Sequence, residues 1–270
     1  MGLERRDGTM IPAETSRTRL VMLAAAFAAI YGTLRLFPIF VMIGGSGRVF
    51  STTEFIAPLL GIVLGPYAGP LAAAVGTFLG IMITGRTNFF GLDFLAPMMN
   101  ALVLGLLMRR KWILSVIIYS VLLALFFAHP STLHFVSVPF LTGTIEFPFI
   151  WLHIIVWVLL VSPLGRRSAE WISGATRWKA IAATCLLALI GTMTQQLTGT
   201  LVFASMAVTL MGLTSQSLAK MWVAIFYVYP IERLVVVLPA ATLVTFAVAR
   251  ALKATGLFHR TSRSHERHQE

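Results

Sequence analysis

The chain has 270 residues, of which 57% are hydrophobic and only 11% are charged. Soluble domains carry about 25% charged residues, and here long apolar runs separate short clusters of charge, so the composition excludes an ordinary soluble domain and predicts a polytopic membrane protein. A net charge of +11 would point to nucleic acid in a soluble protein. The basic residues lie at the ends of apolar segments, however, which is typical of membrane topology and predicts no nucleic-acid partner.

The length leaves room for one transmembrane domain between two basic tails. We expect a cytoplasmic N-terminal tail over 1–19, a single transmembrane domain over 20–250 and a polar C-terminal tail over 251–270. The first apolar run, which begins at Leu20, is long for a signal peptide and is interpreted as a retained helix. The single cysteine, Cys185, excludes an internal disulfide and metal sites built on paired cysteines.

In chain order, the apolar runs predict an all-α transmembrane bundle of about eight helices, with both termini cytoplasmic. The runs cover residues 20–37, 53–65, 67–84, 93–108, 112–128, 147–163, 180–212 and 221–249. The second and third runs are short for a span of about 20 residues, and the strong breaker Gly65-Pro66 separates them. The seventh run is too long for one span, and Gly191 and Gly199 predict a kink or a break in it.

The distribution of charge sets the predicted orientation. Most of the 21 lysines and arginines fall in the tails and in the loops around 109–111 and 166–179, which we assign to the cytoplasm. The predicted outer loops hold only Arg48, Arg86 and Lys220. We therefore expect a multi-pass protein of the plasma membrane, with membrane lipid among its partners.

The scarce polar residues inside the helices lie at similar predicted depths, between mid-membrane and the outer surface. Ionisable residues in a membrane are costly and usually face a partner, water or a ligand. We therefore expect one outward-facing cavity for a small-molecule substrate, with apolar walls and a few polar groups. The candidate binding residues are Arg35, Arg48, Glu54, Asn100, His153, Gln195, Gln196, Trp222, Tyr227 and Glu232.

Structural roles remain open for several of these residues. Gln195 and Gln196 are adjacent on a helix, so at most one is expected to face the cavity, and either could simply join neighbouring helices. Glu232 and the adjacent Arg233 could pair for packing alone. Arg35 could extend to the outer interface instead.

The sequence predicts no cofactor, no metal site and no enzymatic activity. The histidines lack a second ligand one helical turn away, and no H-E-x-x-H pattern occurs. The run 44–47 is rich in glycine but lacks the lysine of a phosphate-binding loop. If ATP drives transport, the motor is another subunit.

A small-residue stripe in the first helix would let another helix approach closely. It consists of Ala24, Ala25, Ala28 and Ala29, spaced four apart in two pairs. The glycine-rich loop before residue 50, the L-G-P-Y-A-G motif at 64–69 and the small-residue helix that follows resemble the substrate-binding S components of energy-coupling factor (ECF) transporters. The end of the last helix, Tyr229 to Arg233, is similar to some members.

This resemblance implies capture of a vitamin, a related micronutrient or a metal ion at the outer face. It further implies docking on a transmembrane T subunit with two ATPases, through Ala24 and Ala28 or through Ala25 and Ala29, with the loop 38–54 as a lid. Typical members have six helices, so a six-helix core is an option and 93–179 departs from the pattern.

Three other functions stay open. A stand-alone secondary transporter would couple through Glu232 or Asp93 and would have broken helices at the midplane. An intramembrane enzyme would need Glu232, Glu146 and His153 within hydrogen-bond reach. An assembly factor for another membrane complex would hold a stable partner and no small ligand.

Overall fold

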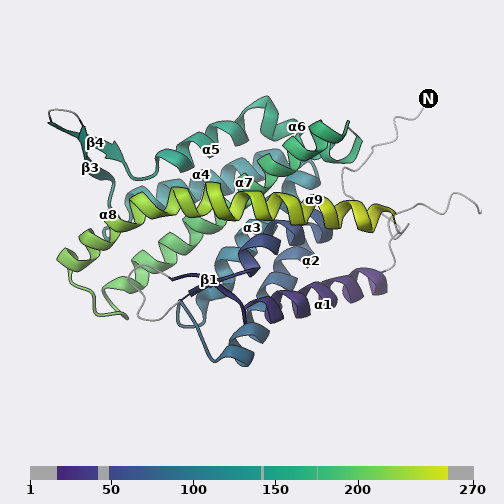
Figure 1. Cartoon of the computed structure of the whole chain (residues 1–270), viewed down its shortest axis with the longest axis horizontal. Coiled ribbons are helices and arrows are strands. Elements are labelled where there is room, and N and C mark those ends of the chain that lie inside the picture. Colours follow the sequence, from purple (N-terminus) through teal and green to yellow (C-terminus); the bar gives the residue numbers. More distant parts are fainter. Residues whose placement is uncertain (1–16, 42–48, 141–142, 175, 255–270) are drawn as a thin grey trace, which may run out of the picture.

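The computed structural model describes residues 17–41, 49–140, 143–174 and 176–254, and these are mostly helical (Figure 1). The helices are α1 (Arg17–Leu34), α2 (Thr53–Thr84), α3 (Leu95–Met108), α4 (Trp112–Ala128), α5 (Trp151–Val161), α6 (Pro163–Gly174), α7 (Arg177–Ala207), α8 (Ser215–Ile231) and α9 (Leu238–Ala254). A short 3₁₀ helix, η1 (Leu92–Phe94), precedes α3, and a π-helical segment, η2 (Glu232–Val237), joins α8 to α9. The strands are β1 (Pro38–Val41), β2 (Val49–Ser51), β3 (Phe135–Phe140) and β4 (Gly143–Pro148).

Helix α2 consists of two arms that fold back on each other at Gly65. This glycine has φ 79° and ψ −171°, a conformation that side chains disfavour, and Pro66 starts the second arm. A Cβ placed on Gly69 would lie 2.7 Å from the carbonyl oxygen of Leu60, which is possible only if the arms lie side by side. The predicted separation of the second and third apolar runs at this point is confirmed.

Glycines allow the neighbouring helices to contact the α2 arms backbone to backbone. A Cβ on Gly76 would lie 2.7 Å from the carbonyl oxygen of Ala28 in α1. On the first arm, a Cβ on Gly61 would lie 2.5 Å from the carbonyl oxygen of Ala101 in α3. Small residues let helices approach this closely, so the glycines of both arms serve internal packing.

Helix α7 runs without a break from Arg177 to Ala207, so a break in the seventh run, one of the two predicted possibilities, is wrong. Gly191 instead makes room for a neighbour, because a Cβ there would collide with the side-chain oxygen of Asn100. Four threonines of this helix, Thr184, Thr192, Thr194 and Thr198, bond back to its own carbonyls, as Thr194 does to Ile190 at 2.7 Å. Their hydroxyls are therefore satisfied within the helix.

The last helix is longer than the sequence predicted and crosses the whole molecule in Figure 1 as α8, η2 and α9. Pro230 lies inside it and does not end it. The π-helical turn that follows carries Glu232 and Arg233. Such turns are rare and are found frequently at functional sites.

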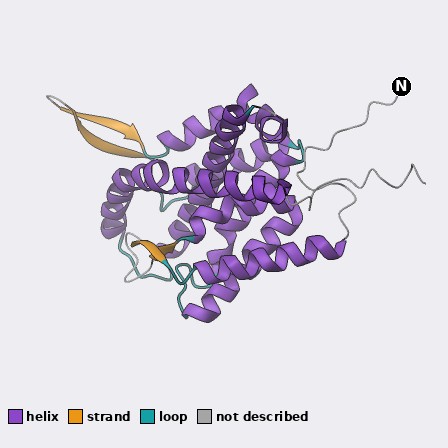
Figure 2. Cartoon of the chain, turned by 45° about the vertical axis from the view of Figure 1, so that its right-hand side comes forward, coloured by secondary structure: helices purple, strands orange, loops and turns teal. Residues whose placement is uncertain are grey.

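The mostly helical structure agrees with the all-α expectation, to which it adds two β-hairpins and one helix that the sequence did not predict. Strands β1 and β2 pair antiparallel, as do β3 and β4, and the second hairpin projects from the helices (Figure 2). Helix α6 occupies a region predicted as a loop and is bent by 69° from α5. Both hairpins form where Val, Ile and Phe residues, which favour strands, lie between helices.

Four helices of the described chain are long and apolar enough to cross a membrane, or five if α5 and α6 form one bent span. The four are α1, α2, α7 and the continuous α8–η2–α9. Helices α3 and α4 are also apolar but shorter. This agrees with a membrane protein.

The two ends of the helix bundle differ in composition. At the basic end, the guanidinium of Arg109 lies 5.3 Å from the ring centre of Tyr67, next to the Gly65 turn, and Arg110 pairs with Glu170 of α6 at 3.5 Å. The opposite end, where α1 ends and α2 begins, is called the cavity end after the cavity described below. There the hydroxyl of Thr52 donates to the carbonyl of Leu34 at 2.9 Å.

Candidate functional site

A cavity opens at the cavity end, between α1, the β1–β2 hairpin, α2, α3, α7 and α8. The space that the centre of a water molecule can reach in it measures about 100 Å³. One water needs only about 10–15 Å³ by the same measure, so the cavity has room for several waters or a small ligand. Its charged and amide-bearing side chains are Arg35, Glu54, Asn88, Asp93, Gln195, Gln196, Glu232 and Arg233.

The structure brings six of the ten predicted binding residues to this cavity: Arg35, Glu54, Gln195, Gln196, Trp222 and Glu232. Both adjacent glutamines line it, so the expectation that at most one would do so is wrong. Because α7 passes along one wall, neighbouring positions on it can both border the space. Arg48 lies outside the described residues.

Three predicted residues lie away from the cavity wall. Asn100 is buried behind Gln195. His153 is buried between Tyr119, whose hydroxyl lies 3.2 Å from Nδ1, and the stacked ring of Tyr229. Tyr227 is 47% exposed and points out of the bundle. These positions give Asn100 and His153 supporting places next to residues that line the cavity.

A buried polar network joins four elements at the cavity floor. Arg233 of η2 pairs with Glu54 of α2 at 2.5 Å, and the Gln195 side chain of α7 donates to the same carboxylate at 2.8 Å. Asn100 of α3 donates to the oxygen of Gln195 at 2.8 Å. Arg233 therefore pairs with Glu54 and not with the adjacent Glu232, and the network fixes the relative positions of α2, α3, α7 and η2.

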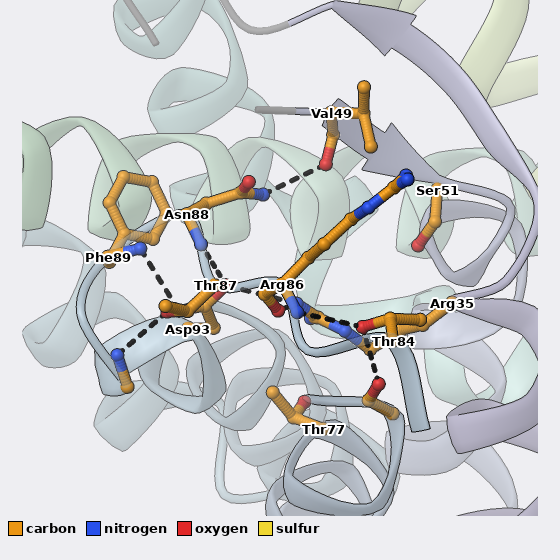
Figure 3. A network of polar contacts seen from close by, with 12 residues as sticks. Arg35, Val49, Ser51, Thr77, Thr84, Arg86, Thr87, Asn88, Phe89 and Asp93 are labelled. Carbon is orange, nitrogen blue, oxygen red and sulfur yellow. Dashed lines mark hydrogen bonds and ion pairs between the residues drawn. The ribbon is translucent and has the colours of Figure 1, made fainter. Parts of the chain in front are cut away.

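A second ion pair lies at the cavity rim (Figure 3). Arg35 donates to Asp93 at 3.1 Å. The carboxylate of Asp93 also accepts from the backbone N–H groups of Asn88 at 2.8 Å and Phe89 at 3.0 Å, and from the hydroxyl of Thr87.

These contacts determine the charge of Asp93, which lies in the connection between α2 and α3. Burial by itself would raise the pKa of Asp93. The hydrogen bonds from Thr87, Asn88 and Phe89 and the charge of Arg35 outweigh burial and lower the pKa below its ordinary value. Asp93 is thus an ionised and fully engaged carboxylate.

The β1–β2 hairpin is tied to this rim. The side-chain nitrogen of Asn88 donates to the carbonyl of Val49 in β2 at 2.9 Å (Figure 3). The N–H of Thr52 donates to the carbonyl of Phe37 at 2.9 Å, which closes the base of the hairpin. The described parts of the segment predicted as a lid thus border the cavity, and residues 42–48 of it lie outside the description.

Aromatic rings form much of the remaining wall: Tyr31, Phe50, Phe89, Phe203, Trp222 and Tyr229. The indole N–H of Trp222 donates to the carbonyl of Ser131 at 2.8 Å, and the hydroxyl of Tyr229 donates to the carbonyl of Phe149 at 3.1 Å. Both side chains are almost fully buried, and the ring of Tyr229 is stacked with Phe149 and with His153. Trp222 and Tyr229 therefore support the wall and present little surface to the cavity.

Among the lining residues that sequence reasoning left out of its binding set are Tyr31, Phe50, Asp93 and Arg233. Asp93 and Arg233 carried a usable signal, because each is a charged residue in or beside an apolar run. Nothing in the sequence marks Tyr31 and Phe50 as binding residues, since an aromatic residue in or next to a membrane helix is most often part of the packing.

The alanine stripe of α1 divides between two faces. Ala28 is buried against α2, and Ala24 is half-buried. Ala25 and Ala29 are exposed. Of the two predicted docking pairs, only Ala25 and Ala29 remain accessible.

No family model matches the chain, and no curated protein or solved structure is significantly similar to it. Within the described residues, no group of three or more His, Cys, Asp or Glu side chains is placed to hold a metal ion.

Proposed function

We propose that the protein is the substrate-capture subunit of an ECF-type uptake transporter for a vitamin or related micronutrient. The observation that carries this proposal is the cavity, which collects buried polar groups from separate helices and surrounds them with aromatic rings. Buried ion pairs stabilise a fold weakly and are often replaceable by apolar residues. Two such pairs bordering one cavity are better explained by a ligand site.

The charge distribution supports an outward-facing cavity. Arg109, Arg110 and Lys111 lie at the basic end, beside α6 with Arg166 and Arg167. The positive-inside rule assigns such an end to the cytoplasm. The cavity lies at the opposite end, where a substrate arriving from outside would enter. The start of α1 and the end of α9 lie on the same side of the molecule as α6 (Figure 1).

The proposed partners are a transmembrane T subunit and separate ATPases, since the sequence holds no phosphate-binding loop. The exposed face of α1 with Ala25 and Ala29 is the proposed docking surface, because small residues permit close helix contact. In this arrangement the binding site and the docking stripe lie on different parts of the molecule, so each can be altered separately.

The test is native mass spectrometry of the detergent-purified chain, comparing the wild type with Gly199→Leu. A Cβ at Gly199 would meet its nearest neighbours at 3.9 Å and 4.0 Å, so a leucine enters the cavity without striking backbone. We expect the wild type to retain a small molecule and Gly199→Leu to lose it. The matched control is Ala182→Leu, at an exposed position of the same helix, which keeps the ligand.

An empty wild-type chain, purified from cells rich in vitamins, would contradict high-affinity capture. A ligand retained by Gly199→Leu would show that the site lies elsewhere. Substrate uptake by the chain alone in liposomes would favour a secondary transporter over a subunit that needs ATPases.

A further inference from the structure

The β3–β4 hairpin, which joins α4 to α5 and projects from the helices (Figure 2), has two chemically different faces. Its strands pair in register from Phe135 opposite Pro148 to Phe140 opposite Gly143. Successive side chains of a strand point to opposite faces, so this register fixes which residues lie together. One face, called the apolar face, consists of Val136, Val138, Phe140, Gly143, Ile145 and Phe147. The opposite face, called the polar face, carries Phe135, Ser137, Pro139, Thr144, Glu146 and Pro148.

Helices cover only the base of the apolar face. Val136 is 2% exposed, and the ring centre of Phe147 lies 6.0 Å from the ring centres of Trp151 in α5 and Phe226 in α8. Further along the hairpin, Ile145 is 47% and Phe140 is 57% exposed. A two-stranded hairpin is marginally stable in water unless its apolar face packs against another layer. The outer half of this face therefore needs an apolar partner.

The apolar face continues into the lateral surface of the helices. Phe226, which Phe147 contacts, packs at 5.1 Å against the ring of the exposed Tyr227. Near the start of α5, the side chains of Ile154 and Ile155 are also exposed. Helix α8 belongs to one of the four helices long and apolar enough to cross a membrane. In a membrane, lipid acyl chains cover the lateral surface of such a helix, and the same lipid layer reaches the hairpin.

The charge of the hairpin agrees with this partner. Residues 129–150 contain no lysine or arginine, so the segment has no basic side chain with which to bind an acidic protein or anionic headgroups. Its one carboxylate, Glu146, is exposed on the polar face and accepts a hydrogen bond from Ser137. An apolar face without charge fits hydrocarbon, and a polar face with a carboxylate fits water.

The free edges of the hairpin limit how deep it can lie. Two paired strands leave N–H and C=O groups unpaired along their outer edges, and the hydrocarbon core of a bilayer cannot satisfy them. The boundary between headgroups and acyl chains can, and amphipathic elements there bury their apolar face by about 5–10 Å.

We propose that the β3–β4 hairpin lies on the membrane surface, with Phe140 and Ile145 among the lipid acyl chains and Glu146 facing water. In this position the hairpin anchors its end of the helix bundle at the level of the lipid headgroups. The inference goes beyond the proposed function and requires only that the chain spans a membrane.

Spin labels on the two faces test the proposal. Cys185→Ala removes the single native cysteine, and Ile145→Cys, Glu146→Cys and Val158→Cys then place one label each in the full chain. Ile145 and Glu146 are adjacent and lie on opposite faces, so each is the matched control for the other. Val158, exposed on α5, is the lipid-facing reference. In nanodiscs of phosphatidylcholine, power-saturation EPR measures collisions of each label with oxygen, which concentrates among acyl chains, and with a polar nickel chelate, which stays in water.

We expect the ratio of oxygen to nickel collisions to be lowest at residue 146, higher at 145 and highest at 158. Replacing part of the phosphatidylcholine by anionic phosphatidylglycerol should leave this order unchanged, because the hairpin has no basic side chain. Thermal unfolding in the same nanodiscs confirms that the labelled variants keep the fold, since all three positions are exposed.

Three results would overturn the proposal. Equal ratios at residues 145 and 146 would place both faces of the hairpin in water. A label at 145 that is shielded from both oxygen and nickel would show that a protein surface, such as a second copy of this chain, covers the apolar face. An order that appears only with anionic lipid would mean that charge, and not apolar insertion, holds the hairpin at the membrane.

Discussion

The two ends of the helix bundle are built from different kinds of contact. At the basic end, helices meet through backbone, because Gly61, Gly69 and Gly105 lie against the carbonyls and peptide atoms of their neighbours. Around the cavity, side chains join the helices, chiefly the Glu54–Arg233 and Arg35–Asp93 pairs, although α1 and α2 still meet through Gly32 and Gly76. Backbone packing leaves no room for a ligand, whereas side-chain pairs can border an open space.

The difference indicates how the chain can hold a polar cavity among apolar helices. Close packing around the Gly65 turn fixes where the α2 arms and α3 lie, so their other ends need not pack tightly. The cost of burying charge at the cavity end is offset by pairing and by hydrogen bonds from Gln195. Substitutions at the two ends should therefore destabilise the protein for different reasons: loss of a counter-charge at the cavity end and steric overlap at the basic end.

The largest expected effect is at the cavity end. Arg233→Met removes the guanidinium and leaves Glu54 buried without its counter-charge, which should lower the free energy of unfolding by about 3–5 kcal/mol. Thermal or denaturant unfolding in a fixed detergent measures the loss. The double variant Glu54→Met/Arg233→Met should recover most of it, because no lone charge remains. Equal losses in the single and the double variant would show that the pair itself, and not the unpaired charge, decides stability.

The basic end should respond to added volume. A Cβ on Gly105 would collide with the backbone of Gly65 and Pro66, so Gly105→Val should destabilise the protein by about 1–3 kcal/mol or more through overpacking. Gly199→Val, in the same kind of helical setting but beside the cavity, is the control and should cost far less. If both variants unfold at the same temperature, backbone packing is not what distinguishes the two ends.

The smallest effect on stability is expected at the exposed stripe of α1. Ala25→Leu faces away from the bundle and should change the free energy of unfolding by no more than about 0.5 kcal/mol, while abolishing co-purification with the proposed T subunit. Ligand retention should be unaffected. Ala28→Leu, buried against Gly76, should destabilise the chain instead. Co-purification that survives in Ala25→Leu would exclude this face of α1 as the docking surface.

Much of the helical organisation could be predicted from local patterns. The run 112–128 coincides with α4, and the breaker at Gly65 was recognised as a separation. In α7, Gly191 was predicted to interrupt the helix. It lies instead within the continuous helix and leaves space for the side chain of Asn100. A single sequence carries no sign of which role a helical glycine has, since the partner lies about 90 residues away in the chain.

The candidate site shows the same division. Depth along the helices was enough to bring Arg35, Glu54, Gln195, Gln196, Trp222 and Glu232 to one end. The sequence does not show which way a side chain points around its helix axis. Tyr227 was therefore included although it points outward, and only one of the two glutamines was expected at the wall. Pairing was equally hidden, since Arg233 joins Glu54 across the bundle and not its neighbour Glu232.

The sequence by itself determined the apolar helical class, the approximate helix positions and the segregation of charge to one end, because these depend on composition and local periodicity. The tertiary structure decided which arginine pairs with which carboxylate, which face of α1 remains open and where strands replace loops. Those features depend on contacts between residues far apart in the chain, and their energies arise only when the helices are placed against one another.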